Sequence, residues 1–600
     1  MPKTKILILT LILLAFLQAG LLVYLFFEIS KSPDKNFLSG VFFGGEMNRS
    51  RSSEDKNFSD NGNKALGGIL PHHLIVREEI ESYLSRLAGK DYDEIILICP
   101  NHFSRGKYKI AFPKTTDRED DEGLGLVKEV LKTGLAGEDD EVIANEPSVT
   151  ALTPIIREHF PQAKIIPVIL KPNVTAGESE ILAEKIFQYT ERGNTLVLAS
   201  ADFSHYQSFA TAELHDEKSR KVIENFTMNE IYRLEIDSPA SVYTILKFAQ
   251  LREAEKAELV FHTNSGELAG NIDAPSTSHL FYYFYRGKKE PDPGATFLFF
   301  GDLMLDRHVG EKIKKDGLES LFSELAGEEQ RFFQGMDIIS ANLEGAVTDK
   351  GAHYSPANAY DFAFSPELIG GLKKYNFNFF NLANNHFSDQ GQRGIIETGK
   401  NLQTMGFSFS GCQDAEAGEC SATIVEKNGL KIGMAGFSMV YKKFDLAEAE
   451  KIVSELKKQS DLAVVNIHWG TEYEHAAGAV QKETGRTLVD AGADMIIGHH
   501  PHVVQGMEIY KNKPIFYSLG NFVFDQYFSP DTQEGLAAGI AYNKNKIRIF
   551  LIPLKSSGSR PGLMSGSAKD EFFVKFIDWS SLDEKVKEQI SANGIIELKQ

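Results

Sequence analysis

Short apolar runs alternate with amphipathic stretches along most of this chain. In its first half, the apolar runs have the length of buried strands, and 180–193 carries the apolar repeat of a helix; the runs lie at 92–99, 163–170 and 194–200. Alternation of strands with helices predicts α/β layering, with helices packed against a sheet.

The same pattern continues in the second half. The expected strands are 295–301, 336–343, 376–383, 431–437, 462–469, 493–498 and 514–520, and helices are expected at 447–459 and 480–492. A chain of 600 residues is too long for one hydrophobic core. The pattern therefore predicts two α/β domains.

Polar stretches without a hydrophobic period separate these regions. One follows the N-terminal apolar segment, and a second, "RGKKEPDPGA", covers 286–295. Such composition is typical of tethers and joints. The predicted organisation is a membrane anchor at 1–28, a flexible linker at 29–66, one domain at 67–286, a short linker at 287–294 and a second domain at 295–600.

The N-terminal segment predicts a membrane anchor. Residues Ile6–Phe27 are interrupted only by Thr10 and Gln18. At about 1.5 Å per residue, a helix of this length crosses the hydrocarbon core of about 30 Å. Lys3 and Lys5 place the N-terminus in the cytoplasm. We expect a single-pass protein of the cell membrane whose bulk is extracytoplasmic; cleavage near 17–20 is the alternative.

The net charge limits the possible binding partners, and the cysteine positions raise the question of a disulfide. The formal net charge is −19, which disfavours nucleic acid as a partner. Cys412 and Cys420 lie in the loop-like stretch "GCQDAEAGEC". In an oxidising compartment they could form a disulfide, and two unpaired thiols are the alternative.

Five expected strands of the second domain end in polar donors. In open α/β sheets, sites form beyond the carboxyl ends of strands. Singly, each donor also fits a turn, a helix cap or a core position. Their repetition at equivalent places favours a metal site with Asp, Glu, Asn and His ligands, which suit Zn, Mn or Fe. The donors are Asp302, Asn342 with Glu344, Asn385 with His386, His468, and the cluster His499, His500 and His502.

These motifs carry a resemblance. "GDLMLDR", "ANLEG", "NLANNHFSDQGQRG", "HWGTEY", "GADMIIGHHPHVVQ" and "YSLGNFVFD" occur in order between 301 and 525. This region resembles the CapA family of poly-gamma-glutamate capsule biosynthesis proteins, within the calcineurin-like metallophosphoesterases. The resemblance implies a four-layer α/β/β/α sandwich whose divalent metal ions are Mn, Zn or Fe.

The resemblance also implies roles for single residues. Asp302 looks like the first-motif aspartate, acting in catalysis and as a ligand, and His386 looks like the general acid. The implied metal ligands are Asp302, Glu344, Asn385, His468, His500 and His502, with His499 as a neighbour or substitute. The chain departs from the usual Asp-x-His at Asp302-Leu303-Met304.

The first domain has its own strand-end donors. These could form a mononuclear site of the non-haem iron type, although each also fits a cap, turn or core position. The residues are His72, His73, His102, Asp202, His205 and His262.

Four motifs give the first domain a resemblance too. "PHH", "PNHFS", "SADFSHY" and "TNSGELAG" resemble the Memo-like family, including the AmmeMemoRadiSam system protein B group, related in fold to class III extradiol dioxygenases. The resemblance implies metal or catalytic positions at His72, His102, Asp202 and His205. Where the family commonly has Glu-His-Ser-x-Glu, this chain reads "EPSVT" at 146–150, so a binding role is the alternative to catalysis.

The leading hypothesis is a membrane-anchored protein whose CapA-like domain is a metal-dependent hydrolase in capsule, poly-gamma-glutamate or other cell-envelope polymer metabolism. Polymer synthesis machinery is the expected partner. One rival is a non-catalytic assembly factor for a polymer synthase or exporter. The other is a mononuclear-metal redox protein that acts through its Memo-like domain.

Overall fold

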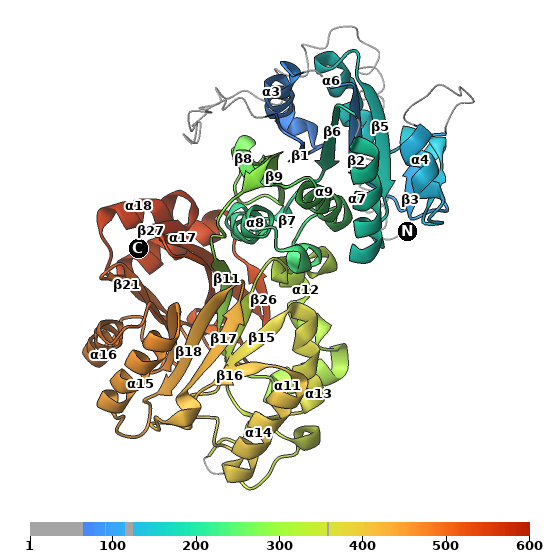
Figure 1. Cartoon of the computed structure of the whole chain (residues 1–600). Helices are drawn as coiled ribbons and strands as arrows, with labels where there is room; N and C mark the ends of the chain where they lie inside the picture. Colours follow the sequence, from blue (N-terminus) through green and yellow to red (C-terminus); the bar gives the residue numbers. More distant parts are fainter. Residues whose placement is uncertain (1–63, 91, 115–123, 192, 357–358, 600) are drawn as a thin grey trace, which may run out of the picture. The chain divides into compact units, whose positions relative to one another are not determined.

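The computed structural model describes residues 64–599, apart from 91, 115–123, 192 and 357–358. The predicted anchor and nearly all of the predicted linker at 29–66 therefore lie outside the described residues. Among the helices that are described, none has both the length and the apolar character that crossing a bilayer requires. The described chain forms one compact unit with two α/β domains, which confirms the prediction of two α/β domains (Figure 1).

The N-terminal domain is built on a mixed sheet whose centre is parallel. Strands β1, β6, β2 and β5 run parallel to one another, so their carboxyl ends meet at one edge. The sheet order is β10 (Gly287–Lys288), β8 (Ala254–Asn264), β9 (Ser276–Tyr285), β1 (Gly67–Leu70), β6 (Thr195–Ser200), β2 (Glu94–Pro100), β5 (Lys164–Leu170), β3 (Ile110–Phe112) and β4 (Ala136–Glu138), with β7 (His205–Gln207) on β9.

Helices cover both faces of this sheet (Figure 1). On one face, Ile96 and Val197 pack with Leu182 of α7 and Ile245 of α9. On the other face, strand residues pack with helices α3 and α6. The helices of this domain are α3 (Arg77–Ala88), α4 (Leu124–Leu131), α5 (Asp140–Ala144), α6 (Pro147–His159), α7 (Ala176–Thr190), α8 (Phe209–Glu224), α9 (Pro239–Leu251) and α10 (Ser265–Leu268).

The C-terminal domain contains two larger sheets. The first has the order β16 (Ser408–Ser410), β15 (Phe377–Asn381), β12 (Ile338–Leu343), β11 (Gly294–Leu303), β24 (Glu534–Asn543), β25 (Lys546–Ser557) and β26 (Arg560–Leu563), with β23 (Asn521–Val523) on β11 and β27 (Ile595–Lys599) on β25. The second has the order β17 (Ala422–Lys427), β18 (Leu430–Ser438), β19 (Leu462–His468), β20 (Met495–His499), β22 (Lys513–Leu519) and β21 (Val504–Tyr510). A separate pair joins β13 (Ala346–Val347) to β14 (Ala363–Phe364).

These two sheets pack face to face with helices outside them. The core between the sheets includes Phe297 and Phe299 of β11 and Met434 of β18. The outer face of the first sheet is covered by α11 (Arg307–Asp316), α12 (Glu319–Ala326), α13 (Pro366–Gly371) and α14 (Gly391–Met405), and that of the second by α15 (Leu446–Gln459) and α16 (Ala479–Asp490). Helices α17 (Gly566–Trp579) and α18 (Glu584–Asn593) pack on the inter-sheet core.

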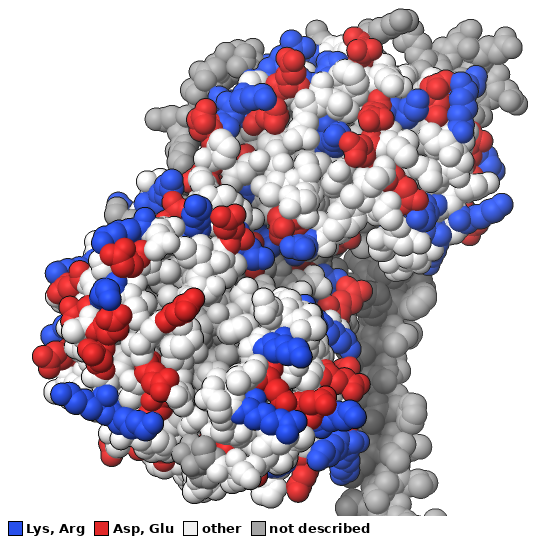
Figure 2. Space-filling view, turned by 60° about the horizontal axis from the view of Figure 1, so that its bottom comes forward, with Lys and Arg blue, Asp and Glu red and all other residues white. Residues whose placement is uncertain are grey.

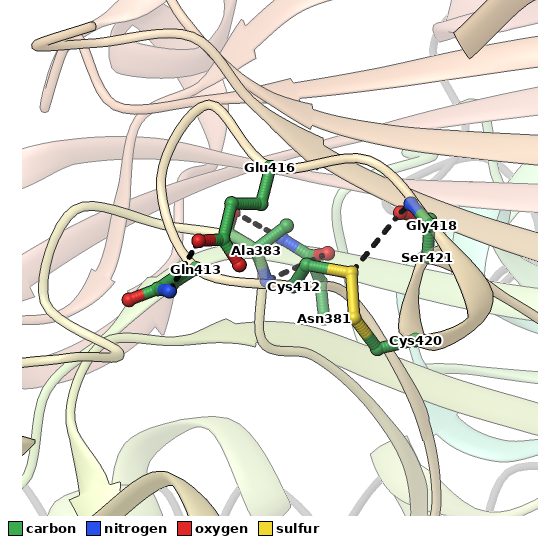
Figure 3. The surroundings of a disulfide bond; sticks show 8 residues. All are labelled: Asn381, Ala383, Cys412, Gln413, Glu416, Gly418, Cys420 and Ser421. Atoms are coloured by element: carbon green, nitrogen blue, oxygen red, sulfur yellow. Dashed lines mark hydrogen bonds between the residues drawn. A yellow bond between two sulfur atoms is a disulfide. The ribbon is translucent and has the colours of Figure 1, made fainter. Parts of the chain in front are cut away.

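The crossover between the two sheets carries a disulfide. Cys412 and Cys420, between β16 and β17, are bonded with Cα atoms 5.3 Å apart. The backbone N–H of Gly411 donates to the carbonyl of Cys420 at 2.8 Å, and the loop lies beside Ala383, just beyond β15 (Figure 3). Of the two alternatives that the sequence left open, the structure contains the disulfide.

Helix α8 joins the two domains through charged contacts. Arg548 of β25 pairs with Glu213 at 3.0 Å and also with Glu217, and all three side chains are largely buried. Nearby, Lys218 pairs with Asp337 of the C-terminal domain at 3.0 Å. Burial would raise the pKa of Glu217, but the positive charges of Arg548 and Arg220 lower it to about 2.

Arg548→Met is expected to lower the free energy of unfolding by about 3–5 kcal/mol, because it leaves buried carboxylates without their partner. The stabilisation from Glu217 is complete above its ordinary pKa of 4.5 and is lost as pH falls through about 2. In the variant this pH-dependent stabilisation is reduced, so the difference in stability from the wild type should shrink as pH falls towards 3. Urea titrations between pH 3 and 7 measure both effects.

The matched control is Arg393→Met, since Arg393 forms an exposed i,i+4 pair with Glu397. Pairs of this kind contribute about 0.3–0.5 kcal/mol. Equal losses in the two variants would contradict the role given to Arg548.

Candidate functional site

The carboxyl ends of strands from both sheets meet at one site in the C-terminal domain. In the first sheet, Asp302 of β11 is in register with Asn342 of β12. In the second sheet, His468 ends β19 and is in register with His499, which ends β20. The two pairs come from different sheets, so the site lies where both sheets end.

Asp302, Asn342 and Glu344 form its acidic floor. The side-chain nitrogen of Asn342 lies 2.8 Å from Asp302 Oδ1, 3.1 Å from Glu344 Oε1 and 3.1 Å from His468 Nδ1. All three floor residues are fully buried. One amide thus positions two carboxylates and an imidazole together.

Imidazoles surround this floor. His468 Nε2 lies 2.7 Å from Asn385 Oδ1 and 3.1 Å from His500 Nδ1. His502 Nδ1 lies 3.2 Å from Asp302 Oδ2. His500 and His502 have φ values of 98° and 58°, a strained conformation for residues with a side chain. The backbone strain therefore coincides with the residues that line the site.

His386 lies at the side of the site with a carboxylate partner. Its Nδ1 is 2.9 Å from Asp389 Oδ2, and its Nε2 is 3.9 Å from Glu344 Oε2. The ring of Phe362 packs 4.4 Å from the imidazole, centroid to centroid. This arrangement fixes the ring with Nε2 toward the acidic floor.

The residues present fit divalent cations. Glu344 Oε2 and both ring nitrogens of His499 are buried and form no hydrogen bond. Burial, reinforced by the charge of Asp302, raises the pKa of Glu344 well above its ordinary value. Burial and the charge of His502 lower the pKa of His500 to about 4, so this imidazole is neutral at pH 7, as a metal ligand must be.

Two groups of side chains in this site could hold a metal ion. Their ligand atoms lie within 4.8 Å of one another, and the groups share His502; they are Asp302, Glu344 and His502, and Glu472, His500 and His502. Burial would raise the pKa of Asp302, but hydrogen bonding to His502 and the charge of that ring lower it below its ordinary range. Carboxylate and imidazole donors of this kind suit Zn, Mn or Fe.

A second cluster forms at the sheet edge of the N-terminal domain. His72 follows β1, and its Nε2 lies 3.1 Å from His102 Nε2 and 3.4 Å from Asp202 Oδ2. Asp237 joins His72 and His102 in one candidate metal group, and it joins Asp202 and His205 in another. A cavity of about 460 Å³ lies beside this cluster and is lined by His72, His73, Leu74, Pro147, Thr150, Ala151 and Asp202.

The structure thus brings the sequence-predicted donors together in two places. The six ligands predicted for the C-terminal domain share one site with His386, and the four predicted for the N-terminal domain share the second cluster. His262 does not belong there, because it pairs with Asp216 at 2.8 Å and Glu213 at 3.4 Å. It lies within β8, where alternate side chains point to opposite faces, and not at a strand end.

Sequence reasoning missed other participants. Glu472 lies in "HWGTEY", shortly after a predicted strand, and this position could have identified it as a candidate ligand. Asp389 lies three residues beyond His386, in the turn that precedes α14. Asp237 had no such signal, because it precedes α9 in a loop that follows no strand.

The fold and the two donor clusters define the class: a protein of two α/β domains, each with a candidate metal centre. Residues 296–526 match the family model "Bacterial capsule synthesis protein PGA_cap", and residues 55–278 match "Memo-like protein". The chain therefore belongs to the bacterial capsule synthesis protein family and carries a Memo-like domain before that region.

Individual relatives agree with both resemblances. The PGA biosynthesis protein CapA of Bacillus subtilis is 31% identical over 307 residues, which cover 45% of this chain and 79% of that protein. The capsule biosynthesis protein CapA of Bacillus anthracis is 28% identical over 337 residues, covering 52% and 81%. A MEMO1 family protein of Caldivirga maquilingensis is 24% identical over 241 residues, covering 36% and 82%. The resemblances predicted from the sequence are confirmed for both domains.

Proposed function

We propose that the C-terminal domain is a metal-dependent hydrolase that acts in the metabolism of a capsule, of poly-gamma-glutamate or of another cell-envelope polymer. The observation that carries the proposal is the buried Glu344 Oε2, which has no hydrogen bond and lies beside a second carboxylate and neutral imidazoles. A buried carboxylate oxygen without a partner is costly. A cation between these groups removes that cost.

The proposed ligands are Asp302, Glu344, Asn385, His468, His500 and His502. Divalent ions in such a site lower the pKa of water and neutralise charge on the oxygens of a bond being hydrolysed. The strained turn through His500 and His502 brings the His502 ring to Asp302 and the His500 ring to His468. His468 and His500 stay neutral and available because burial lowers the pKa of each ring.

His386 is the proposed proton donor. Asp389 accepts from Nδ1 and stabilises the imidazolium, so the second proton is held on Nε2, which faces the acidic floor. The backbone N–H of His386 donates to Asn384 Oδ1 at 3.0 Å, which sets the turn that presents the ring. Phe362 packs against the imidazole and helps to hold its orientation. A leaving oxygen near Nε2 receives the proton from that atom.

The function is tested on the full-length chain purified in detergent. The chain is stripped with a chelator, reloaded separately with Mn²⁺, Zn²⁺ and Fe²⁺, and assayed with bis-p-nitrophenyl phosphate as a generic phosphodiester. We expect hydrolysis that disappears on chelation and returns with at least one metal. A chain that binds metal at the proposed ligands and hydrolyses neither this compound nor capsular polymer would instead be an assembly factor for a polymer synthase or exporter.

We further propose that the protein is anchored in the cell membrane by 6–27, with its N-terminus cytoplasmic and both domains outside. The apolar segment supports this proposal, and so does the disulfide, which is typical of oxidising compartments. Charged side chains of both signs are interspersed on the face shown in Figure 2. Protease added to cells stripped of their wall should digest both domains without lysis; protection until lysis would contradict this orientation.

A further inference from the structure

Five side chains in the N-terminal domain form two triads that share one carboxylate. His72, His102 and Asp237 offer ligand atoms within 4.8 Å of one another, and so do Asp202, His205 and Asp237. The sequence predicted one ion held by four of these residues. Asp237 was absent from that prediction, yet it is the member common to both triads.

The first triad has the spacing of ligands around one ion. His72 Nε2 and His102 Nε2 are 3.1 Å apart, and Asp237 Oδ2 lies 3.4 Å from the former and 3.7 Å from the latter. Bonds of about 2.1 Å in tetrahedral geometry place neighbouring ligand atoms about 3.4 Å apart. The three atoms therefore need little movement to bind one cation.

A contact to the Nδ1 atom orients each imidazole of this triad. His72 Nδ1 lies 2.9 Å from Ser200 Oγ, and His102 Nδ1 contacts Glu146, the residue that also caps α6. Such contacts to the far nitrogen orient histidine ligands in metal sites. They leave both Nε2 atoms directed at the same point.

Asp237 supplies an oxygen with no hydrogen bond. Its side chain is 9% exposed, and Oδ2 accepts no hydrogen bond, whereas Oδ1 accepts from the backbone N–H of Asp202 at 3.2 Å. In the second triad, His205 Nδ1 is also buried without a hydrogen bond. In the absence of a metal ion, the charged partners within reach of this oxygen are the rings of His72 and His102, at 3.4 Å and 3.7 Å, and a cation bound here would take their place.

The charge around the cluster exceeds what one divalent ion balances. Asp202, Asp237 and Glu146 are all at least nine-tenths buried as side chains, and the partners found for them around the cluster include imidazoles but no Lys or Arg. Glu235, beside His205, pairs with Arg331 instead. Three buried carboxylates leave a net negative charge after one divalent ion is bound, so the cluster can accept further positive charge.

We infer that Asp237 is a ligand shared by two divalent ions in the Memo-like domain. One ion lies with His72 and His102, and the other lies with Asp202 and His205. Shared carboxylates are typical of two-metal sites. The 460 Å³ cavity beside His72 and Asp202 gives a small ligand access to this pair. The inference concerns the N-terminal domain and does not depend on the hydrolase proposed for the other domain.

The test uses the full-length chain with Asp302→Ala and His500→Ala, so that the C-terminal site does not contribute. After loading with Mn²⁺, metal content is measured by mass spectrometry, and coupling between ions by electron paramagnetic resonance. We expect two ions per chain and an exchange-coupled signal. Asp237→Asn should lose both ions and the coupled signal. His72→Ala and His205→Ala should each remove one ion and leave an uncoupled signal.

Asp140→Asn, an exposed acidic position on α5, is the matched control and should keep both ions. Circular dichroism verifies the fold of each variant. A single ion and an uncoupled signal before any change at Asp237 would overturn the inference, as would full metal content in a folded Asp237→Asn variant. The first of these outcomes needs no Asp237 variant, so the inference stays testable if that variant fails to fold.

Discussion

Replacing Asp302 with alanine is expected to abolish metal-dependent hydrolysis, with kcat/KM at least about 1,000-fold lower, equivalent to about 4 kcal/mol of transition-state stabilisation. Asp302 is fully buried and contacts Asn342 and His502 directly. Its removal takes a carboxylate from the metal site and leaves these groups without their common partner. The bis-p-nitrophenyl phosphate assay and the bound metal content measure the two effects on the same sample.

The matched control is Asp316→Ala, which removes an aspartate at the end of α11 from an ion pair with Arg560. It should keep both activity and metal. His468→Ala should reproduce the Asp302→Ala result, because His468 is a proposed ligand whose Nε2 contacts two other proposed ligands, Asn385 and His500. A folded Asp302→Ala variant with wild-type activity would exclude catalysis at this site.

The second large effect is expected from His386→Gln. Loss of a positioned proton donor costs about 100-fold or more in kcat, while the metal content should stay that of the wild type, because the donor lies outside the predicted ligands. The deficit should shrink for esters with p-nitrophenolate as leaving group, since this group departs without a proton. Rates for a series of leaving groups of rising pKa measure the difference in slope.

Asp389→Asn tests the orientation of that donor. Asp389 contacts Nδ1 and not the proposed substrate position, so it is a positioning residue. We expect a smaller loss of kcat than in His386→Gln, with the same dependence on the leaving group. Equal losses for good and poor leaving groups in His386→Gln would show that His386 does not donate the proton.

Much of the fold followed from local pattern. The apolar run predicted at 462–469 is β19, which ends at His468, and the helix predicted at 447–459 is α15. In contrast, β24 and β25, which pair along the whole of β24, were not predicted. The place of β24 in the sheet depends on its pairing with β11 in the other half of the domain, and that long-range choice is not encoded in any short window.

The candidate site was predictable where a donor follows a buried strand. Asp302, His468 and the 499–502 histidines all satisfy this rule, because parallel strands deliver their carboxyl ends to one edge. Asp237 does not follow this rule, because no strand directly precedes it. It reaches its cluster from a loop before α9, and the backbone path that places it there is set by the packing of that helix on the sheet.

The Cys412–Cys420 disulfide in the crossover loop has a consequence for where in the cell this loop reaches its final covalent structure. The loop lies against Ala383, at the start of the turn that presents Asn385 and His386 (Figure 3). In a thiol-rich compartment the Cys412–Cys420 bond is absent, and the connection between the two sheets loses its covalent brace. If the chain is exported as proposed, this cross-link forms only after the chain has left the cytosol.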